Sequence, residues 1–215
     1  YTDVAAGPLA INSAADFYLF PNIVFVVKLN GAQIKDWLEA AAQRFNQIDP
    51  AVAADQWLIS SFPGYNFDMF TTADMQYQID VTQAVGSRIV GLQYKSAPID
   101  PAQDFVIATN NYRATSGKSF LPELDGRATI YASPDANRDV VISYIKDHPQ
   151  ITRAANGAAQ SWRFAKTPTA GKVMFTSAAN ALPVAQAAGL ANITLEKADD
   201  GTGTQRAVYR VDLGQ

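Results

Sequence analysis

The pattern of apolar and polar residues in the first quarter of the chain predicts a strand followed by a helix. Residues 22–31, NIVFVVKLNG, are rich in β-branched side chains and predict a buried strand that ends at the turn signal Asn30-Gly31. Over residues 32–48 the apolar side chains recur every three or four positions, as on one face of a helix. The pair Asp49-Pro50 is expected to close this helix. Residues 12–20 are compatible with a short helix or a turn.

The rest of the chain mixes the two periodicities. Alternation of apolar and polar residues predicts strands over residues 57–70, 75–83, 88–94, 104–111, 161–166, 172–177 and 207–213. A helix is predicted over residues 133–148, with Ser133 as its cap and Pro134 at its first position. The Ala-rich residues 180–190 predict another helix. The sequence therefore predicts one α+β domain over residues 1–215, with mixed β-sheets and three to four helices.

Composition narrows the possible partners. The chain has 215 residues, 48% of them apolar, which is enough for one sizeable core. Its 17 basic and 20 acidic residues give a formal charge of −3, so it lacks the basic face that a nucleic-acid polymer requires. No apolar run approaches the roughly 18 residues of a membrane span. With no cysteine, the chain forms neither disulfides nor thiolate sites.

The chain is also poor in residues that bind catalytic metals. Its single histidine, His148, stands beside Pro149 and is expected in a surface turn, whereas metal-dependent hydrolases draw several ligands from histidines and carboxylates. Asp199 and Asp200 fall in a Gly-rich hairpin and are expected to be solvated. No residue is therefore assigned to catalysis or to a metal. Because the chain begins at Tyr1 without an initiator methionine or a signal-peptide pattern, we expect it to be cut from a longer polypeptide.

Asn110, Asn111 and Tyr112 crowd together where a predicted strand ends, which allows two interpretations. In the structural one, the amides satisfy backbone groups and Tyr112 caps the edge of the core. In the functional one, the ring stacks on a planar ligand in a cleft and the amides bind its polar edge. A nucleobase suits two such rings, because stacking contributes about 1–3 kcal/mol per base. Spacing alone favours the structural interpretation.

Phe20, in FYLFPN, is the other aromatic residue near the end of a predicted element. Burial is the commonest fate of an aromatic side chain in a domain of this size. However, Pro21-Asn22 predicts that the chain turns directly after Phe20, which leaves this ring at the end of its segment.

The residues ATSGKS, 114–119, share a Gly-Lys-Ser sequence with phosphate loops. The phosphate-loop motif also requires an earlier glycine and a helix after the Ser or Thr. No glycine stands between Ile107 and Gly117, and Phe120, Leu121 and Pro122 follow Ser119. This segment is not a phosphate loop.

A series of motifs in a fixed order resembles the C-terminal domain of the 5′-nucleotidase family, in its branch of bacterial bifunctional 2′,3′-cyclic-nucleotide 2′-phosphodiesterases/3′-nucleotidases. The motifs are GPLAINSAADFYLFPN, VKLNGAQIKDWLEAAAQRFNQIDP, YNFD, YQIDVTQ, PIDPAQDFVIATNNYRATSG, ASPDANRDV and WRFA. The resemblance runs from Gly7 to Phe164 and continues more weakly to YRVDL near the end of the chain.

This resemblance implies a division of labour. In the family, an N-terminal metallophosphoesterase domain holds two divalent metal ions and hydrolyses the phosphoester. The C-terminal domain holds the nucleoside between two aromatic rings, and domain rotation brings the phosphate to the metals. The chain is therefore expected to lack the N-terminal domain, to hold no cofactor of its own, to be inactive alone, and to come from a periplasmic protein.

Matched residue by residue, the resemblance implies that Phe20 of YLFPN and Tyr112 of NNYRA are the two stacking rings. Asn22 matches a family asparagine beside the base. Asn110 and Asn111 are expected to line the same nucleotide site.

The sequence departs from the family motif at a residue that binds the ribose. The 5′-nucleotidases have Gly-Gly-Asp after the second ring, with the Asp binding the ribose, whereas this chain has Ser116-Gly117-Lys118. Loss of the Asp fits 2′,3′-cyclic or 3′-nucleotides, which carry phosphate on the ribose oxygens. Gly117 and Lys118 are therefore included among the substrate-binding residues, with Lys118 expected to favour the phosphate.

Two other functions remain open at this point. The chain could be a stand-alone binding module for another flat small ligand, such as a sugar or a free base. It could also be a structural or dimerising domain whose aromatic residues are buried. Exposed rings at Phe20 and Tyr112 that face each other across a gap of about 7 Å, roughly two stacking distances, would favour the binding functions over the structural one.

Overall fold

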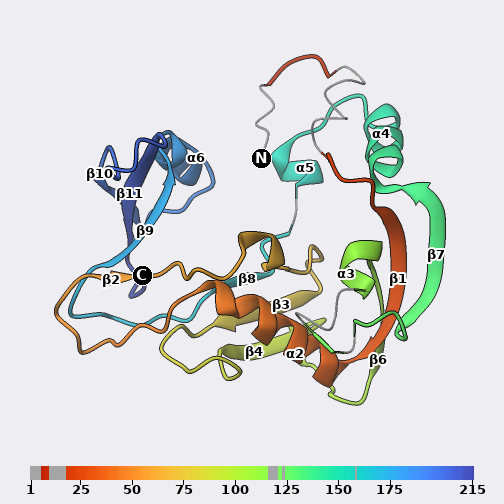
Figure 1. Cartoon of the computed structure of the whole chain (residues 1–215), viewed down its shortest axis with the longest axis horizontal. Helices are drawn as coiled ribbons and strands as arrows, with labels where there is room; N and C mark the ends of the chain where they lie inside the picture. The colour runs from red at the N-terminus through yellow and green to blue at the C-terminus, as the bar shows by residue number, and fades with distance from the viewer. Residues whose placement is uncertain (1–5, 10–17, 116–120, 123, 158) are drawn as a thin grey trace. The chain divides into compact units, whose positions relative to one another are not determined.

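The computed structural model describes residues 6–9, 18–115, 121–122, 124–157 and 159–215. The chain divides into two compact units (Figure 1). Unit 1 comprises Tyr1–Ile34 and Ile99–Ala159, and unit 2 comprises Lys35–Pro98 and Gln160–Gln215. Each unit is thus built from segments that lie far apart in the sequence.

Helices and three sheets make up the described part of the chain, which confirms the α+β class. The strands are β1 (Ile23–Asn30), β2 (Gln56–Trp57), β3 (Met75–Ile79), β4 (Ile89–Tyr94), β5 (Ala97–Pro98), β6 (Asp104–Asn110), β7 (Thr129–Ala136), β8 (Trp162–Phe164), β9 (Val173–Ala178), β10 (Ile193–Lys197) and β11 (Arg206–Val211). The helices are α2 (Gly31–Ala41), α3 (Asn111–Thr115), α4 (Asn137–Asp147), α5 (Arg153–Asn156) and α6 (Ala181–Ala187), with 3₁₀ turns η1 (Ala42–Arg44) and η2 (Gly64–Asn66). Within the described residues, no helix is both long enough and apolar enough to cross a membrane.

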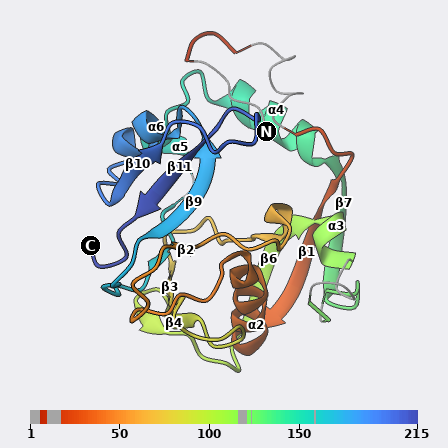
Figure 2. The same cartoon turned by 60° about the vertical axis from the view of Figure 1, so that its left-hand side comes forward.

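Unit 1 contains a three-stranded antiparallel sheet in which β1 lies between β6 and β7 (Figure 1). Val27 and Leu29 on β1 are 0% and 1% exposed, so one face of this strand lies in the core. Val24 pairs with Asn110, which places the end of β6 beside the start of β1. Helix α3 follows β6 directly and lies against β1 (Figure 2).

Unit 2 contains two four-stranded mixed sheets, in the orders β10-β11-β9-β2 and β5-β4-β3-β8. Strand β2 runs parallel to β9, and β8 runs parallel to β3. Four aromatic rings pack together with centroids 5.0–6.1 Å apart, mostly edge to face: Phe45, Phe67, Trp162 and Phe164. Such pairs stabilise a core beyond the area that they bury.

The predicted turn at Asn30-Gly31 is wrong, because β1 passes directly into α2. Asn30 Oδ1 accepts the Gln33 amide at 2.9 Å, and Gln33 Oε1 accepts the Asn30 amide at 2.9 Å. This reciprocal pair satisfies amides at the helix start in the manner of a capping box. Gly31 is required there because a Cβ would lie 2.2 Å from the Asp100 carbonyl oxygen.

The helix predicted to reach Asp49-Pro50 ends earlier, at Ala41, with the 3₁₀ turn η1 continuing to Arg44. A guanidinium from far along the chain accounts for this end. Nη1 of Arg88 donates to the carbonyl oxygens of Ala42 at 2.9 Å and Phe45 at 2.6 Å. The Ala42 carbonyl also accepts the amide of Phe45 at 3.1 Å, whereas Arg88 supplies the donor for the Phe45 carbonyl beyond the helix end.

The start of the helix predicted from Ser133 is also wrong. Ser133 and Pro134 belong to β7, and α4 begins at Asn137. Pairing with β1 overrides the local Ser-Pro signal, since Ala136 pairs with Ile23. Strand β7 is at the edge of its sheet, where a proline without an amide hydrogen is tolerated.

Most of the other predicted strands are confirmed within a few residues of their ends. The exceptions lie in unit 2. Of residues 57–70, only Trp57 belongs to a strand, β2, and η2 begins at Gly64, directly after Pro63. Strand β10 was not predicted, although Ile193 and Leu195 alternate with polar residues along its five residues, ITLEK. Most of the segment 12–20 lies outside the described residues.

Candidate functional site

The junction between β6 and α3 is built by an asparagine. Asn110 Oδ1 accepts the backbone amide of Arg113 at 2.7 Å. Asparagine is a preferred N-cap residue because its side-chain oxygen satisfies an amide of the first helical turn. The sequence thus changes from strand to helix without a loop, and Tyr112 lies in the first turn of α3.

The hydroxyl of Tyr18 joins two segments of unit 1. It accepts Nδ2 of Asn22 at 2.8 Å and Nδ2 of Asn110 at 3.1 Å. One residue further along, Asn111 Oδ1 accepts the amide of Ile23 at 2.9 Å. These bonds fix the chain before β1 against the strand-to-helix junction.

Two aromatic rings are exposed on these joined segments. Phe20 is 67% exposed. Its ring contacts the ring of Tyr18 edge to face, with the two ring centroids 6.3 Å apart. Tyr112 is 48% exposed, and the guanidinium of the buried Arg113 lies 5.9 Å from its ring centroid. The register between β1 and β6 places both rings at the same end of the strand pair. The site therefore offers aromatic surface on a backbone held by hydrogen bonds.

The structure brings five of the seven predicted site residues to this end of the sheet: Phe20, Asn22, Asn110, Asn111 and Tyr112. The hydrogen bonds found for the three asparagines hold the local fold. Gly117 and Lys118 lie outside the described residues. Binding of a ligand by any of the seven residues stays a prediction.

Sequence reasoning missed two residues that build the site. The hydroxyl of Tyr18 connects the two segments, a role that its place in the sequence does not indicate. Arg138, on α4, donates to the carbonyl oxygen of Tyr18 and was not singled out. The only available signal was the presence of Arg138 in the motif ASPDANRDV. Its partner lies 120 residues away.

Unit 2 holds a separate surface cavity of about 410 Å³, lined by Gln47, Ile48, Asp49, Pro50, Gln56 and Thr82. The polar side chains here bond to nearby backbone. Gln56 accepts the Asp49 amide and donates to its carbonyl, and Gln47 donates to the Thr82 carbonyl. None of the five predicted site residues that the structure describes lines this cavity.

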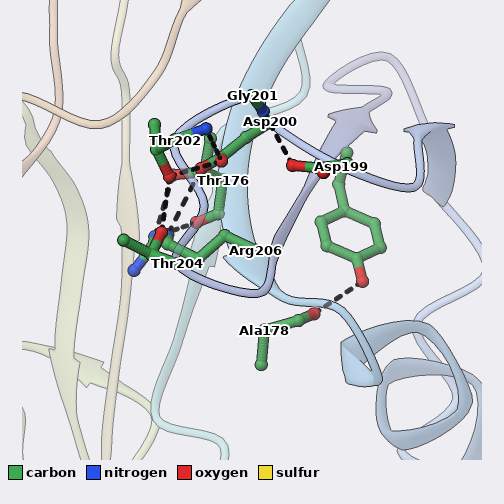
Figure 3. A network of polar contacts seen from close by, with 9 residues as sticks. Thr176, Ala178, Asp199, Asp200, Gly201, Thr202, Thr204 and Arg206 are labelled. Carbon is green, nitrogen blue, oxygen red and sulfur yellow. Dashed lines mark hydrogen bonds and ion pairs between the residues drawn. The ribbon is translucent and has the colours of Figure 1, made fainter.

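The two acidic residues of the hairpin between β10 and β11 are engaged in its structure (Figure 3). Asp199 is exposed and accepts the Gly201 amide, but the side chain of Asp200 is only 6% exposed. Its Oδ1 accepts the amide and hydroxyl of Thr202, and these bonds hold the pKa of Asp200 below its usual value. The expectation of solvation is therefore wrong for Asp200. Within the described residues, no group of three or more histidines and carboxylates could hold a metal ion.

Comparison with known proteins identifies the family. The family model described as "5'-nucleotidase, C-terminal domain" matches residues 1–124. The chain belongs to the 5′-nucleotidase family. The matched residues include both exposed rings, Phe20 before β1 and Tyr112 on α3, so the candidate site lies in the family domain.

Two relatives in this 5′-nucleotidase family align with almost the whole chain. The trifunctional nucleotide phosphoesterase protein YfkN of Bacillus subtilis is 37% identical over 226 residues, covering 99% of this chain and 15% of YfkN. The 2′,3′-cyclic-nucleotide 2′-phosphodiesterase/3′-nucleotidase of Haemophilus influenzae is 36% identical over 233 residues, covering 100% of this chain and 35% of that protein. The chain thus spans about a third or less of the length of these relatives.

A solved 5′-nucleotidase shares the fold. The crystal structure of a 5′-nucleotidase precursor from Thermus thermophilus matches with a TM-score of 0.55 at 17% identity, covering 75% of this chain and 29% of that one. At this identity the likeness concerns the fold alone. Together with the family match, it confirms the resemblance drawn from the sequence motifs.

Proposed function

We propose that this 5′-nucleotidase C-terminal domain recognises the nucleoside part of 2′,3′-cyclic and 3′-nucleotides, as part of a periplasmic phosphodiesterase/nucleotidase. The base would stack between Phe20 and Tyr112. An N-terminal metallophosphoesterase domain of the same polypeptide, with two divalent metal ions, would hydrolyse the phosphoester. Relatives named for this activity, of which the chain spans only part, support the assignment.

The observation that carries the proposal is the exposure of two aromatic rings on segments that hydrogen bonds join. Phe20 and Tyr112 are 67% and 48% exposed, while Tyr18 hydrogen-bonds to both Asn22 and Asn110 below them. Leaving large rings in water forgoes burial energy, and a stacked base would recover it. Stacking is worth about 1–3 kcal/mol per base. Exposure of both rings argues against a structural role in which these rings are buried.

Calorimetric titration of the chain with adenosine, 3′-AMP and ribose tests this proposal. We expect adenosine and 3′-AMP to bind and ribose to bind far more weakly, because only the nucleosides carry a base. Phe20→Ala and Tyr112→Ala should each weaken adenosine binding by about 1–3 kcal/mol. Tyr131→Ala is the matched control, since Tyr131 is a 54% exposed tyrosine on β7 of the same unit.

Three results would contradict the proposal. Equal affinity for ribose and adenosine would favour the module for another flat ligand. Unchanged adenosine affinity in both ring variants would remove the stacking site. Phosphatase activity of this chain with added Mn²⁺ would contradict the assignment of hydrolysis to another domain.

The ribose end of the ligand is proposed from sequence. Lys118 stands where other 5′-nucleotidases have the ribose-binding Asp, and its positive charge suits a phosphate on the 2′ or 3′ oxygen. Lys118→Ala should therefore weaken the binding of 3′-AMP more than the binding of adenosine. An equal effect on the two ligands would overturn this role for Lys118.

A further inference from the structure

The segment Tyr18–Asn22 has no regular secondary structure, but the first turn of α4 holds its backbone. Nε of Arg138 donates to the carbonyl oxygen of Tyr18 at 3.1 Å, and Nη2 donates to that of Leu19 at 3.4 Å. The amide of Asn137 donates to the carbonyl oxygen of Asn22 at 2.9 Å. Contacts from α4 therefore lie on both sides of Phe20.

These contacts act on the peptide groups that direct the ring. The carbonyl of Leu19 belongs to the planar peptide that joins Leu19 to Phe20, so its orientation is coupled to the backbone of Phe20. The ring itself is 67% exposed, and its edge-to-face contact with Tyr18 is the one ring contact found for it among the described residues. With so little packing around the ring, its direction depends on the backbone beneath it.

We propose that Arg138 is a positioning residue for the Phe20 ring, which keeps it in the orientation that stacks on a planar ligand. This inference rests on the proposed function. The planar guanidinium presents several N–H donors in a fixed fork and can hold two consecutive carbonyls, whereas a lysine ammonium is a point charge on a flexible stem. A preorganised segment also avoids the entropy cost of being ordered when the ligand binds.

Two readouts on the same chain test the inference. The first is the ¹⁹F NMR signal of 4-fluorophenylalanine placed at position 20, which reports the mobility of the ring without any ligand. The second is the dissociation constant of adenosine by calorimetry. Arg138→Gln removes the charge and the fork, and Arg138→Lys keeps only the charge. Arg127→Gln is the control, because Arg127 is an 84% exposed side chain in the same unit, paired with Asp125.

We expect Arg138→Gln to narrow the ¹⁹F line and to raise the dissociation constant about tenfold, the cost of ordering roughly one backbone residue. Arg138→Lys should give a ¹⁹F linewidth and a dissociation constant between those of Arg138→Gln and the wild type. Arg127→Gln should match the wild type in both. An unchanged ¹⁹F signal in Arg138→Gln would overturn the inference, whether or not the affinity falls. If the wild type binds neither adenosine nor 3′-AMP, the proposed function fails, and the ¹⁹F comparison alone then decides whether Arg138 positions the ring.

Discussion

Replacing Arg88 with alanine would remove a buried cation that joins three segments of unit 2. Arg88 is 2% exposed, and burial lowers the pKa of its guanidinium while the nearby Glu39 carboxylate raises it. The guanidinium donates to the carbonyl oxygens of Ala42, Phe45 and Gln83 at 2.6–3.0 Å. The alanine variant leaves these oxygens without that donor.

The expected loss can be worked from these contacts. A hydrogen bond from a charged donor contributes about 1.5–3 kcal/mol, and the carbonyls of Ala42 and Phe45 lie at the buried end of α2 and η1. Glu39, 6% exposed, keeps its bonds to the amides of Arg88 and Ile89 but loses the opposite charge. We therefore expect Arg88→Ala to lower the free energy of unfolding by about 3–5 kcal/mol, as when a buried pair is broken.

Urea unfolding followed by circular dichroism at pH 7 measures this loss. Arg88→Lys keeps the charge but not the fork of donors, so it should lose about half as much. Arg127→Ala, at an exposed site, should stay within about 0.5 kcal/mol of the wild type. A loss below about 1 kcal/mol in Arg88→Ala, with an unchanged urea dependence, would refute the reasoning that this cation holds the helix end.

Two further stability predictions follow from local contacts. Burial raises the pKa of Asp80, but hydrogen bonds from Thr82 outweigh it and hold the pKa below its usual value. Asp80→Asn should therefore lower the free energy of unfolding by about 0.5–1 kcal/mol at pH 7. Urea midpoints of the two proteins should converge as the pH falls below about 4, because the wild-type carboxylate is then protonated. A difference that stays constant with pH would contradict this prediction. Gly171→Ala would place a Cβ 2.2 Å from the Ala54 carbonyl oxygen. It should therefore lower the free energy of unfolding, measured by thermal unfolding, by about 2 kcal/mol or more. Gly64→Ala is the control, because its nearest new contact is an ordinary 3.6 Å, and equal losses would refute the clash.

Local sequence was sufficient for most strands of the fold, but not for the ends of two helices. Residues 23–30 and 104–110 carry their apolar pattern within a single element, so their strands could be predicted. The end of α2 depends on Arg88, more than 40 residues away, and the start of α4 depends on pairing between Ala136 and Ile23. Neither contact leaves a signal in the neighbouring residues.

In the candidate site, too, some features follow from local sequence and others depend on distant contacts. The exposed rings were selected from motifs, and the cap at Asn110 was of a kind that local sequence suggests. The bond between Tyr18 and Asn110 spans 92 residues, and that between Arg138 and Tyr18 spans 120. Partners at such separations are fixed by the register of the sheet, which the sequence pattern leaves undetermined.

The central position of β1 has a consequence for biosynthesis. More than seventy residues separate the end of β1 from the start of β6, and β7 comes later still. At a synthesis rate of about 5–20 residues per second, β1 leaves the ribosome roughly 4–15 seconds before it can pair. During that interval IVFVVKLN is an unpaired strand of high β-propensity, with a single charge, Lys28. The strand that anchors the candidate site is therefore also a segment prone to aggregate while the chain is being made.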